Sequence, residues 1–258
     1  METILYKLQS NVAHITLNRP EKFNAFNREM ALLLQSTLTE CQTNSNIRAV
    51  LLTGSGKAFC AGQDLAEVID PQGPGMNRIL SEHFNPIVMQ LISLSKPVVV
   101  AVNGVAAGAG ANLALCGDVV LCNEGASFIQ AFTKIGLIPD TGGTYLLPRT
   151  IGRQRASALM MLGDKVTAPE ALQMGMVYKT FAEGTLQQEA TAIAERLAAM
   201  PTQALALTKK ALQSSVISSL EEQLHTEDML QQKAAATSDF KEGVAAFIEK
   251  RTPTFTGK

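Results

Sequence analysis

Asp140 is the side chain whose neighbours in the sequence most suggest chemistry. It lies in IGLIPDTGGTYLLPR, between an apolar run that ends at Pro139 and the pair Gly142 and Gly143. An aspartate at this place is a good helix N-cap, because its carboxylate accepts hydrogen bonds from backbone N–H groups. Apolar neighbours also raise the pKa of a carboxyl group, as an acid or base working near neutral pH requires. This stretch alone favours the cap.

Two turns of small residues follow runs typical of buried strands, FCAGQDL at 59–65 and NGVAAGAGANL at 103–113. Each could point bare backbone N–H groups into a cleft, and the second stands at a predicted helix N-terminus. Two such donors aimed at one oxygen make an oxyanion hole, in which each is worth roughly 3–4 kcal/mol in the transition state. The same glycines would also be needed if these turns simply packed tightly against helices. From the spacing alone, close packing is favoured over an oxyanion hole.

Several other motifs are incomplete. TGSGKAF at 53–59 lacks the upstream glycine and the Ser or Thr of a phosphate-binding loop, and 103–113 lacks the third glycine of a dinucleotide fingerprint. No GxSxG elbow is present, and the three histidines have no triad context. Cys60 is expected to be a buried filler and Asp64 to cap the next helix, rather than to do chemistry.

Composition limits the class of protein. The chain has 258 residues, 46% hydrophobic and 17% charged, with a formal net charge of −1. These values exclude a disordered chain and give no electrostatic signature of binding to nucleic acid or to an anionic membrane. The four cysteines lack metal-site spacing, so we expect reduced thiols and no metal. No signal peptide or membrane-length apolar run is evident, so we expect a cytoplasmic protein.

The apolar pattern predicts an α/β fold. Alternation predicts two strands, at 4–8 and 12–17, and the apolar spacing of NREMALLLQSTLTECQTN at 27–44 predicts a helix that Asn27 can cap. Strand, glycine turn and helix then recur to about residue 180, which indicates stacked ββα-like units. We therefore expect a core over 1–183 and a helical region over 184–258. That region has many apolar positions, which predicts packing on the core or on another subunit.

Five segments in order resemble the crotonase (enoyl-CoA hydratase/isomerase) superfamily: LNRPEKFNAFN, FCAGQDL, KPVVVAVNGVAAGAG, GLIPDTGGT and FIEKRTPTFTGK. The resemblance covers nearly the whole chain. It implies a spiral of ββα units with C-terminal helices that build homotrimers, which often pair into hexamers. It also implies an acyl-CoA thioester as substrate, with no further cofactor, and an enolate held by two backbone N–H groups. Matched by position, those donors are the amides of Gln63 and Ala109.

The departures from the family pattern are informative. Hydratases of the family carry two glutamates that handle water, and Asn112 and Phe132 stand at those positions here. Losing both removes the acid/base pair that hydration needs. Other members place an acid at the position of Asp140, where it can move a proton from the carbon beside the thioester to a carbon two places along. The resemblance therefore implies isomerisation.

Further details narrow the resemblance. AVNGVAAGAG, GLIPDTGG before LLPR, and the final FTGK are similar to members that rearrange ring-1,2-epoxyphenylacetyl-CoA to the oxepin thioester in bacterial phenylacetate degradation. Such enzymes also shift 3-enoyl-CoA to 2-enoyl-CoA. Phe132 suits a ring-derived acyl group, although phenylalanine is equally common as a core residue. A 2-enoyl-CoA hydratase of this fold and a non-catalytic acyl-CoA-binding subunit are the alternatives.

The remaining expected contacts concern the substrate. The resemblance places the nucleotide end of CoA at the turn containing Lys22 and Ala25, with Phe247 and Lys250 near the adenine, the last two from a neighbouring subunit in one arrangement. Asn112 could orient substrate or water, or satisfy a buried backbone group. The predicted substrate-binding residues are thus Ala61, Asp64, Asn112, Phe132, Lys22, Ala25, Phe247 and Lys250.

Overall fold

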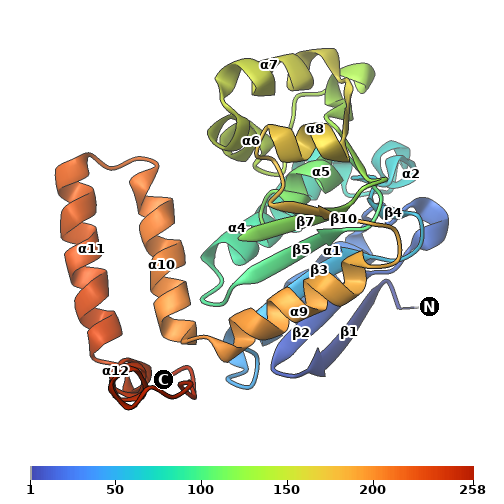
Figure 1. The fold of residues 1–258 in the computed structure, drawn as a ribbon. Coiled ribbons are helices and arrows are strands. Elements are labelled where there is room, and N and C mark those ends of the chain that lie inside the picture. Colours follow the sequence, from blue (N-terminus) through green and yellow to red (C-terminus); the bar gives the residue numbers. More distant parts are fainter. Residues whose placement is uncertain (1) are drawn as a thin grey trace.

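A six-stranded sheet forms the centre of the protein in the computed structural model, which describes residues 2–258 (Figure 1). Its strand order is β1-β2-β3-β5-β7-β10, with β1 and β2 antiparallel and the other neighbours parallel. Every residue of β3 and β5 is buried, as continuous apolar runs predict for strands covered on both faces. The strands are β1 (Ile4–Gln9), β2 (Val12–Leu17), β3 (Ala49–Gly54), β5 (Val98–Val102), β7 (Val119–Asn123) and β10 (Lys179–Phe181).

A second, four-stranded sheet is built from the short strands that follow the central ones. The chain passes from β3 to β4, from β5 to β6 and from β7 to β8, so three successive units each give one strand to each sheet. The second sheet has the order β4 (Ala58–Cys60), β6 (Val105–Ala107), β8 (Ser127–Ile129) and β9 (Lys165–Thr167). The predicted α/β fold of stacked ββα units is confirmed.

Both faces of the central sheet are covered by helices. Along β3, Val50 and Leu52 pack in the main core with α1 and α4, whereas Ala49 and Leu51 face α9. This period of two is what a strand buried on both sides requires. Asn27 caps α1 as predicted, since its Oδ1 accepts a hydrogen bond of 3.0 Å from the Met30 N–H.

The helices account for most of the remaining chain. Residues 65–93 contain three α-helices and a π-helical turn, and the first of these is the helix that Asp64 was expected to cap. The α-helices are α1 (Arg28–Thr43), α2 (Leu65–Ile69), α3 (Gly75–Arg78), α4 (Asn85–Ser93), α5 (Ala109–Ala114), α6 (Gly143–Ile151), α7 (Arg153–Leu162), α8 (Ala168–Gln173), α9 (Leu186–Ala199), α10 (Thr202–Ser215), α11 (Leu220–Ala235) and α12 (Ser238–Glu249). Shorter turns are η1 (Pro20–Lys22), η2 (Ile79–Phe84) and η3 (Ala131–Ile135).

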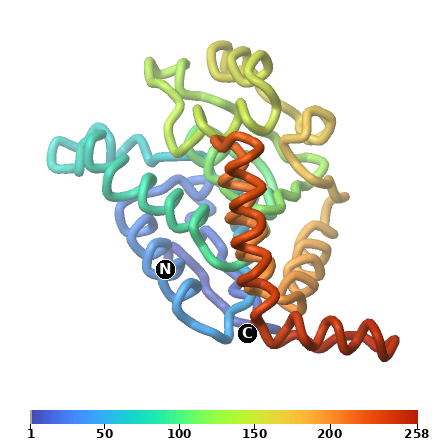
Figure 2. Tube along the Cα trace, turned by 90° about the vertical axis from the view of Figure 1, so that its left-hand side faces the viewer, coloured from blue at the N-terminus to red at the C-terminus, as the bar shows by residue number. Residues whose placement is uncertain are grey.

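The C-terminal helices differ in how they meet the sheet. Helix α9 buries Leu186, Ala190 and Ala194 against it, whereas α10 and α11 form an antiparallel pair beside the core and α12 turns away from it (Figures 1 and 2). Lys209 ties α10 to the core: its Nζ donates to the Leu91 carbonyl at 2.8 Å and to Asp118 Oδ2 at 2.9 Å. Within residues 2–258, every helix is too short or too polar to cross a bilayer.

Candidate active site

A cavity of about 350 Å³ lies where the two small-residue turns meet the loop that carries Asp140. It brings together five of the residues predicted from the sequence, although they come from four separate segments. These five are Ala61, Gln63, Ala109, Phe132 and Asp140. The rest of the wall is formed by Gly62, Leu65, Val68, Met76, Ile79, Gly108, Ala131, Lys134, Ile135 and Leu137.

Two glycines let the turns approach each other closely. A Cβ atom on Gly110 would lie 2.2 Å from the carbonyl oxygen of Cys60, and one on Gly62 would lie 3.3 Å from the amide nitrogen of Ala109. Gly62 also has a φ of +93°, which glycine adopts without strain. The packing explanation of these glycines is therefore correct. The same packing also places the backbones of the two turns side by side at the cavity.

The amides of Gln63 and Ala109 are free to act as donors. Among residues 2–258, neither N–H has a hydrogen-bond partner. In the first turn, the Phe26 N–H donates to the Gly62 carbonyl and the Asp64 N–H donates to the Phe26 carbonyl, so the Gln63 N–H between them points away from that pairing. Ala109 is the first residue of α5, where no earlier helical carbonyl can accept its N–H. Both residues line the cavity, as an oxyanion hole requires.

Asp140 is a partly buried carboxyl group in a mostly apolar wall. Burial raises its pKa, and this effect outweighs the hydrogen bond of 2.7 Å that the Thr141 hydroxyl donates to Oδ1. The expectation that its side chain caps a helix is wrong. Helix α6 begins at Gly143, and its N-cap is Gly142 in a left-handed conformation. The Asp140 carboxylate makes no capping hydrogen bond to the first N–H groups of this helix. The carboxylate remains available to the cavity.

Asn112 lies behind the cavity wall rather than in it. Its side chain is fully buried, and its Nδ2 donates to the backbone carbonyl of Asp140 at 2.8 Å. Its Oδ1 accepts a hydrogen bond of 2.8 Å from Gln130 Nε2. Among the roles considered from the sequence, these contacts match that of satisfying a buried backbone group, here the Asp140 carbonyl.

The apolar part of the wall was mostly missed by the sequence analysis. These residues are part of the same cavity wall as Phe132 and come from α2, α3 and η2: Leu65, Val68, Met76 and Ile79. Their only signal was apolar character within a segment interrupted by proline and glycine. That signal does not distinguish a cavity wall from ordinary core.

Asp64 makes structural contacts and is absent from the cavity lining. Its Oδ1 accepts from the Ala66 N–H at the start of α2, as predicted for a cap, and its Oδ2 pairs with Arg19 at 2.9 Å. Burial alone would raise the pKa of this carboxyl, but the hydrogen bonds from Arg19 and Ala66 prevail and lower it. The Arg19 guanidinium also donates to the Ala25 carbonyl. This arginine therefore joins the 59–65 turn to the turn that precedes α1.

The residues expected at the nucleotide end of CoA lie in two places. Lys22 is exposed at the end of η1, and the Ala61 N–H beside the cavity donates to the Phe23 carbonyl in the same turn. Phe247, 86% exposed, and Lys250 belong to α12 and its C-terminal end. The single chain does not bring these last two to the cavity.

The four cysteines are buried and unpaired, as expected. Cys60 lies directly beside the cavity turn, and burial raises the pKa of its thiol to about 12. A thiol in that state is a poor nucleophile. Across the described residues 2–258, no group of three or more His, Cys, Asp or Glu side chains is arranged to hold a metal ion.

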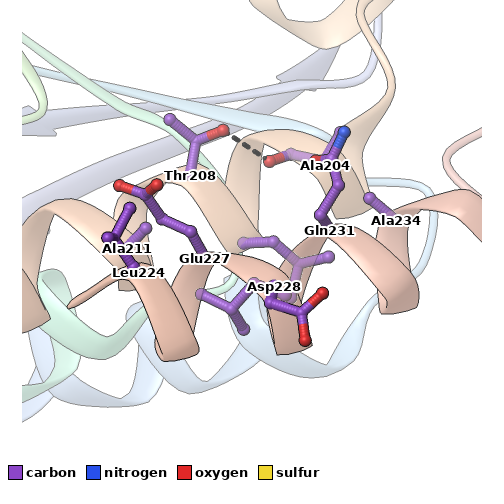
Figure 3. Close-up of a pocket in the computed structure, with 10 residues that line it drawn as sticks. Ala204, Thr208, Ala211, Leu224, Glu227, Asp228, Gln231 and Ala234 are labelled. Carbon is purple, nitrogen blue, oxygen red and sulfur yellow. Dashed lines mark hydrogen bonds between the residues drawn. The ribbon is translucent and has the colours of Figure 1, made fainter. Parts of the chain in front are cut away.

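A larger hollow, of about 520 Å³, lies between α10 and α11 (Figure 3). Glu227 and Asp228 project from α11 beside it, and Thr208 donates within α10 to the Ala204 carbonyl. Two carboxylates would repel the phosphates of a CoA substrate. The smaller cavity at Asp140 is therefore the better candidate for an acyl-CoA thioester.

Comparison with known proteins finds relatives that match this chain over nearly its whole length. The enoyl-CoA hydratase/isomerase family model matches residues 7–258. The chain is 46% identical to 1,2-epoxyphenylacetyl-CoA isomerase of Escherichia coli K12, over all of both chains. It is 36% identical to trans-2-decenoyl-(acyl-carrier-protein) isomerase of Streptococcus mutans, over 99% of this chain and 98% of that one. A crystal structure of an enoyl-CoA hydratase from Bacillus anthracis matches with a TM-score of 0.91 and 34% identity, covering 99% and 100% of the two chains.

Proposed function

The chain belongs to the enoyl-CoA hydratase/isomerase family of acyl-CoA enzymes, and from this premise we propose that it is an isomerase with Asp140 as its acid/base. It moves a carbon–carbon double bond from position 3 to position 2 of an enoyl-CoA, or rearranges ring-1,2-epoxyphenylacetyl-CoA to the oxepin thioester. The observation that carries the proposal is a single buried carboxyl group in a cavity that also presents two unpartnered amides. One proton carrier suffices for a proton shift.

The proposed reaction begins with the thioester oxygen accepting hydrogen bonds from the N–H groups of Gln63 and Ala109. Asp140 removes a proton from C2, and the electrons of the broken C–H bond move through the carbonyl to give a dienolate. The two amides stabilise the negative charge on its oxygen. Asp140 then returns the proton to C4, which leaves a double bond between C2 and C3 and regenerates the carboxylate. For the epoxide, the same amides polarise the thioester while Asp140 acts as acid and base.

Two observations support a ring-derived substrate. The cavity wall is largely apolar and includes Phe132, whose ring is 6% exposed. An aromatic side chain can pack against a planar ring at little cost. The E. coli relative named for the ring epoxide is 46% identical over the full length of both chains. Most of the residues that line the cavity are apolar, and Lys134 is the basic residue among those described. Burying a second charged group of the acyl chain in such a cavity would be costly, so an acyl group without one fits better.

We also propose a homotrimer, or a pair of trimers, as the assembled form. The last three helices and the turn between α10 and α11 expose several large apolar side chains, and burial against a second copy would remove them from water. They include Leu212, Ile217, Leu220, Leu224, Phe240, Val244, Phe247 and Ile248. In such an assembly Phe247 and Lys250 could reach the CoA of a neighbouring subunit.

The experiment compares the wild type with Asp140→Asn on a linear 3-enoyl-CoA. Formation of the conjugated thioester is followed by ultraviolet absorbance, and hydration of 2-enoyl-CoA is measured in parallel. Removing the only proton carrier is expected to lower isomerisation by at least about 100-fold. Asp164→Asn, an exposed aspartate outside the cavity, is the matched control and should keep full activity.

Each result has a distinct meaning. A collapse of isomerisation in Asp140→Asn alone, with little hydration by the wild type, supports the proposal and justifies the ring epoxide as the next substrate. Rapid hydration dependent on Asp140 would favour a hydratase instead. Tight acyl-CoA binding without turnover would indicate a binding subunit, and isomerisation that is indifferent to Asp140 would place the proton carrier elsewhere.

A further inference from the structure

We propose that Asn112 is a positioning residue that fixes Asp140 relative to the oxyanion donor at Ala109. This inference rests on the proposed function, because it concerns the same acid/base. It assigns a role to a side chain that is fully buried and makes no part of the cavity wall. Asn112 acts through Asp140 and does not contact substrate.

Helix α5 links the two functional groups within one turn. It begins at Ala109, whose N–H faces the cavity, and Asn112 follows three residues later. The backbone N–H of Asn112 donates to the Gly108 carbonyl at 3.2 Å, so the segment 108–112 is a single hydrogen-bonded turn. This turn therefore fixes the backbone of Asn112 relative to Ala109.

The Asn112 side chain holds the backbone of Asp140. The carbonyl oxygen of Asp140 accepts two hydrogen bonds, one of 2.8 Å from Asn112 Nδ2 and one of 2.9 Å from the Gly143 N–H. Two donors on one carbonyl restrict how that peptide can rotate. Since the Asp140 side chain leaves the same residue, its carboxylate is restricted with it.

Gln130 fixes the orientation of the Asn112 amide. Its Nε2 donates to Asn112 Oδ1 at 2.8 Å, which directs Asn112 Nδ2 toward Asp140. Gln130 Oε1 is itself buried and has no partner within residues 2–258. The two hydrogen bonds pair both polar atoms of the Asn112 side chain and hold the amide in one orientation.

Gly143 is the second structural requirement of this contact. A Cβ atom there would lie 2.2 Å from Asn112 Nδ2, so only glycine lets the start of α6 approach the amide. Gly143 is not among the positive-φ residues, and alanine could adopt its backbone conformation. An alanine at 143 would disturb the Asn112 contact through the added methyl group alone.

The test measures kcat and KM of Asn112→Ala, Asn112→Asp and Gly143→Ala on the 3-enoyl-CoA used above. Misplacing a reacting group by about 1 Å can cost roughly 100-fold, so we expect kcat to fall between about 10- and 100-fold while KM stays within about twofold. The double variant Asn112→Ala with Gly143→Ala should lose little more than Asn112→Ala, because the clashing side chain is gone.

Thr53→Val is the matched control for lost stability. Thr53 Oγ1 donates to the Ala101 carbonyl at 2.8 Å inside the sheet, so the variant loses the same kind of buried bond away from the cavity. It should lower stability and leave kcat unchanged. If Thr53→Val lowers kcat as much as the Asn112 variants do, the effect is general and the proposal fails.

Asn112→Asp gives a readout that a purely structural role would not move. As a carboxylate it repels the Asp140 carbonyl, but when protonated its O–H can donate to that oxygen as the amide does. The ratio of its kcat to that of the wild type should therefore rise as the pH falls. This ratio also decides the case if Asn112→Ala does not fold.

Three results would overturn the proposal: an unchanged kcat in Asn112→Ala, a rise in KM without a fall in kcat, or a flat kcat ratio for Asn112→Asp. The Asp140→Asn variant separates this from failure of the proposed function. If Asp140→Asn stays active, the proposed function fails. If it is inactive while the Asn112 variants keep their kcat, only the positioning role fails.

Discussion

Replacing Asp140 by asparagine should stabilise the protein at neutral pH, in addition to abolishing the proposed activity. Burial raises the pKa of this carboxyl, and the hydrogen bond from the Thr141 hydroxyl offsets only part of that effect. Asparagine has nearly the same shape, and its Oδ1 can still accept from Thr141. The substitution therefore removes mainly the cost of an ionised group in a poorly solvated place.

The pH dependence follows from the direction of that shift. A carboxyl whose pKa is higher in the folded state than its ordinary 3.8 contributes its full stability below that value, and this contribution is lost as the pH rises through the folded pKa. Asparagine does not titrate. The stability of Asp140→Asn minus that of the wild type should thus be near its minimum at acid pH, grow across this window and then level off.

Single stabilising substitutions commonly gain about 0.5–2 kcal/mol, and we expect Asp140→Asn to lie in this range. For a chain of this size, 1 kcal/mol corresponds to roughly 2–4 °C in Tm. This stability difference can be measured by thermal or urea unfolding of both proteins from pH 4 to pH 8. The protein concentration must be kept constant, because assembly into oligomers also stabilises the fold. The exposed Asp164→Asn variant should show no such gain. If Asp140→Asn is no more stable than the wild type at pH 8, burial is not the main influence on the pKa of the Asp140 carboxyl, and the reasoning is refuted.

Two further predictions concern packing around the fold. Lys209→Met should lower the free energy of unfolding in urea by about 1–3 kcal/mol, because it removes the cation that donates to the partly exposed Asp118 carboxylate and to the Leu91 carbonyl; the double variant with Asp118→Asn should recover part of that loss. Gly110→Ala should lower both stability and activity, since its methyl group would meet the Cys60 carbonyl at 2.2 Å. In the helical Gly243→Ala, the added Cβ would lie 3.5 Å from the Phe255 ring, so this variant should instead gain up to about 1 kcal/mol; equal effects of the two glycine variants would contradict the close-approach argument.

Much of the fold could be predicted from the sequence, because its elements have strong local patterns. The runs that became β3 and β5 are continuously apolar, and Asn27 marks the start of α1. Residues 65–93 could not be assigned in the same way. Helices α2 and α3 there are only five and four residues long, so no apolar period can develop, and η2 has a π-helical spacing.

The site residues could be predicted where they occupy fixed positions in a recognisable motif. The resemblance placed Gln63, Ala109 and Asp140 together, and all three line one cavity. One prediction from local chemistry failed. Asp140 looked like a helix cap, but Thr141 and Gly142 both adopt positive φ and delay the start of α6 to Gly143. Such a turn depends on tertiary packing against Asn112, which the local sequence does not reveal.

The apolar wall of the cavity acts on both halves of the proposed reaction in the same direction. It raises the pKa of Asp140, which makes the carboxylate a stronger base toward the weakly acidic C2 proton. It also lowers the local polarity around the amides of Gln63 and Ala109, where a hydrogen bond to a developing oxyanion becomes stronger. A second ionised carboxylate in this space would oppose both effects, by repelling the enolate and by admitting water. An apolar cavity with one carboxyl group therefore fits a proton shift within the substrate better than the addition of water.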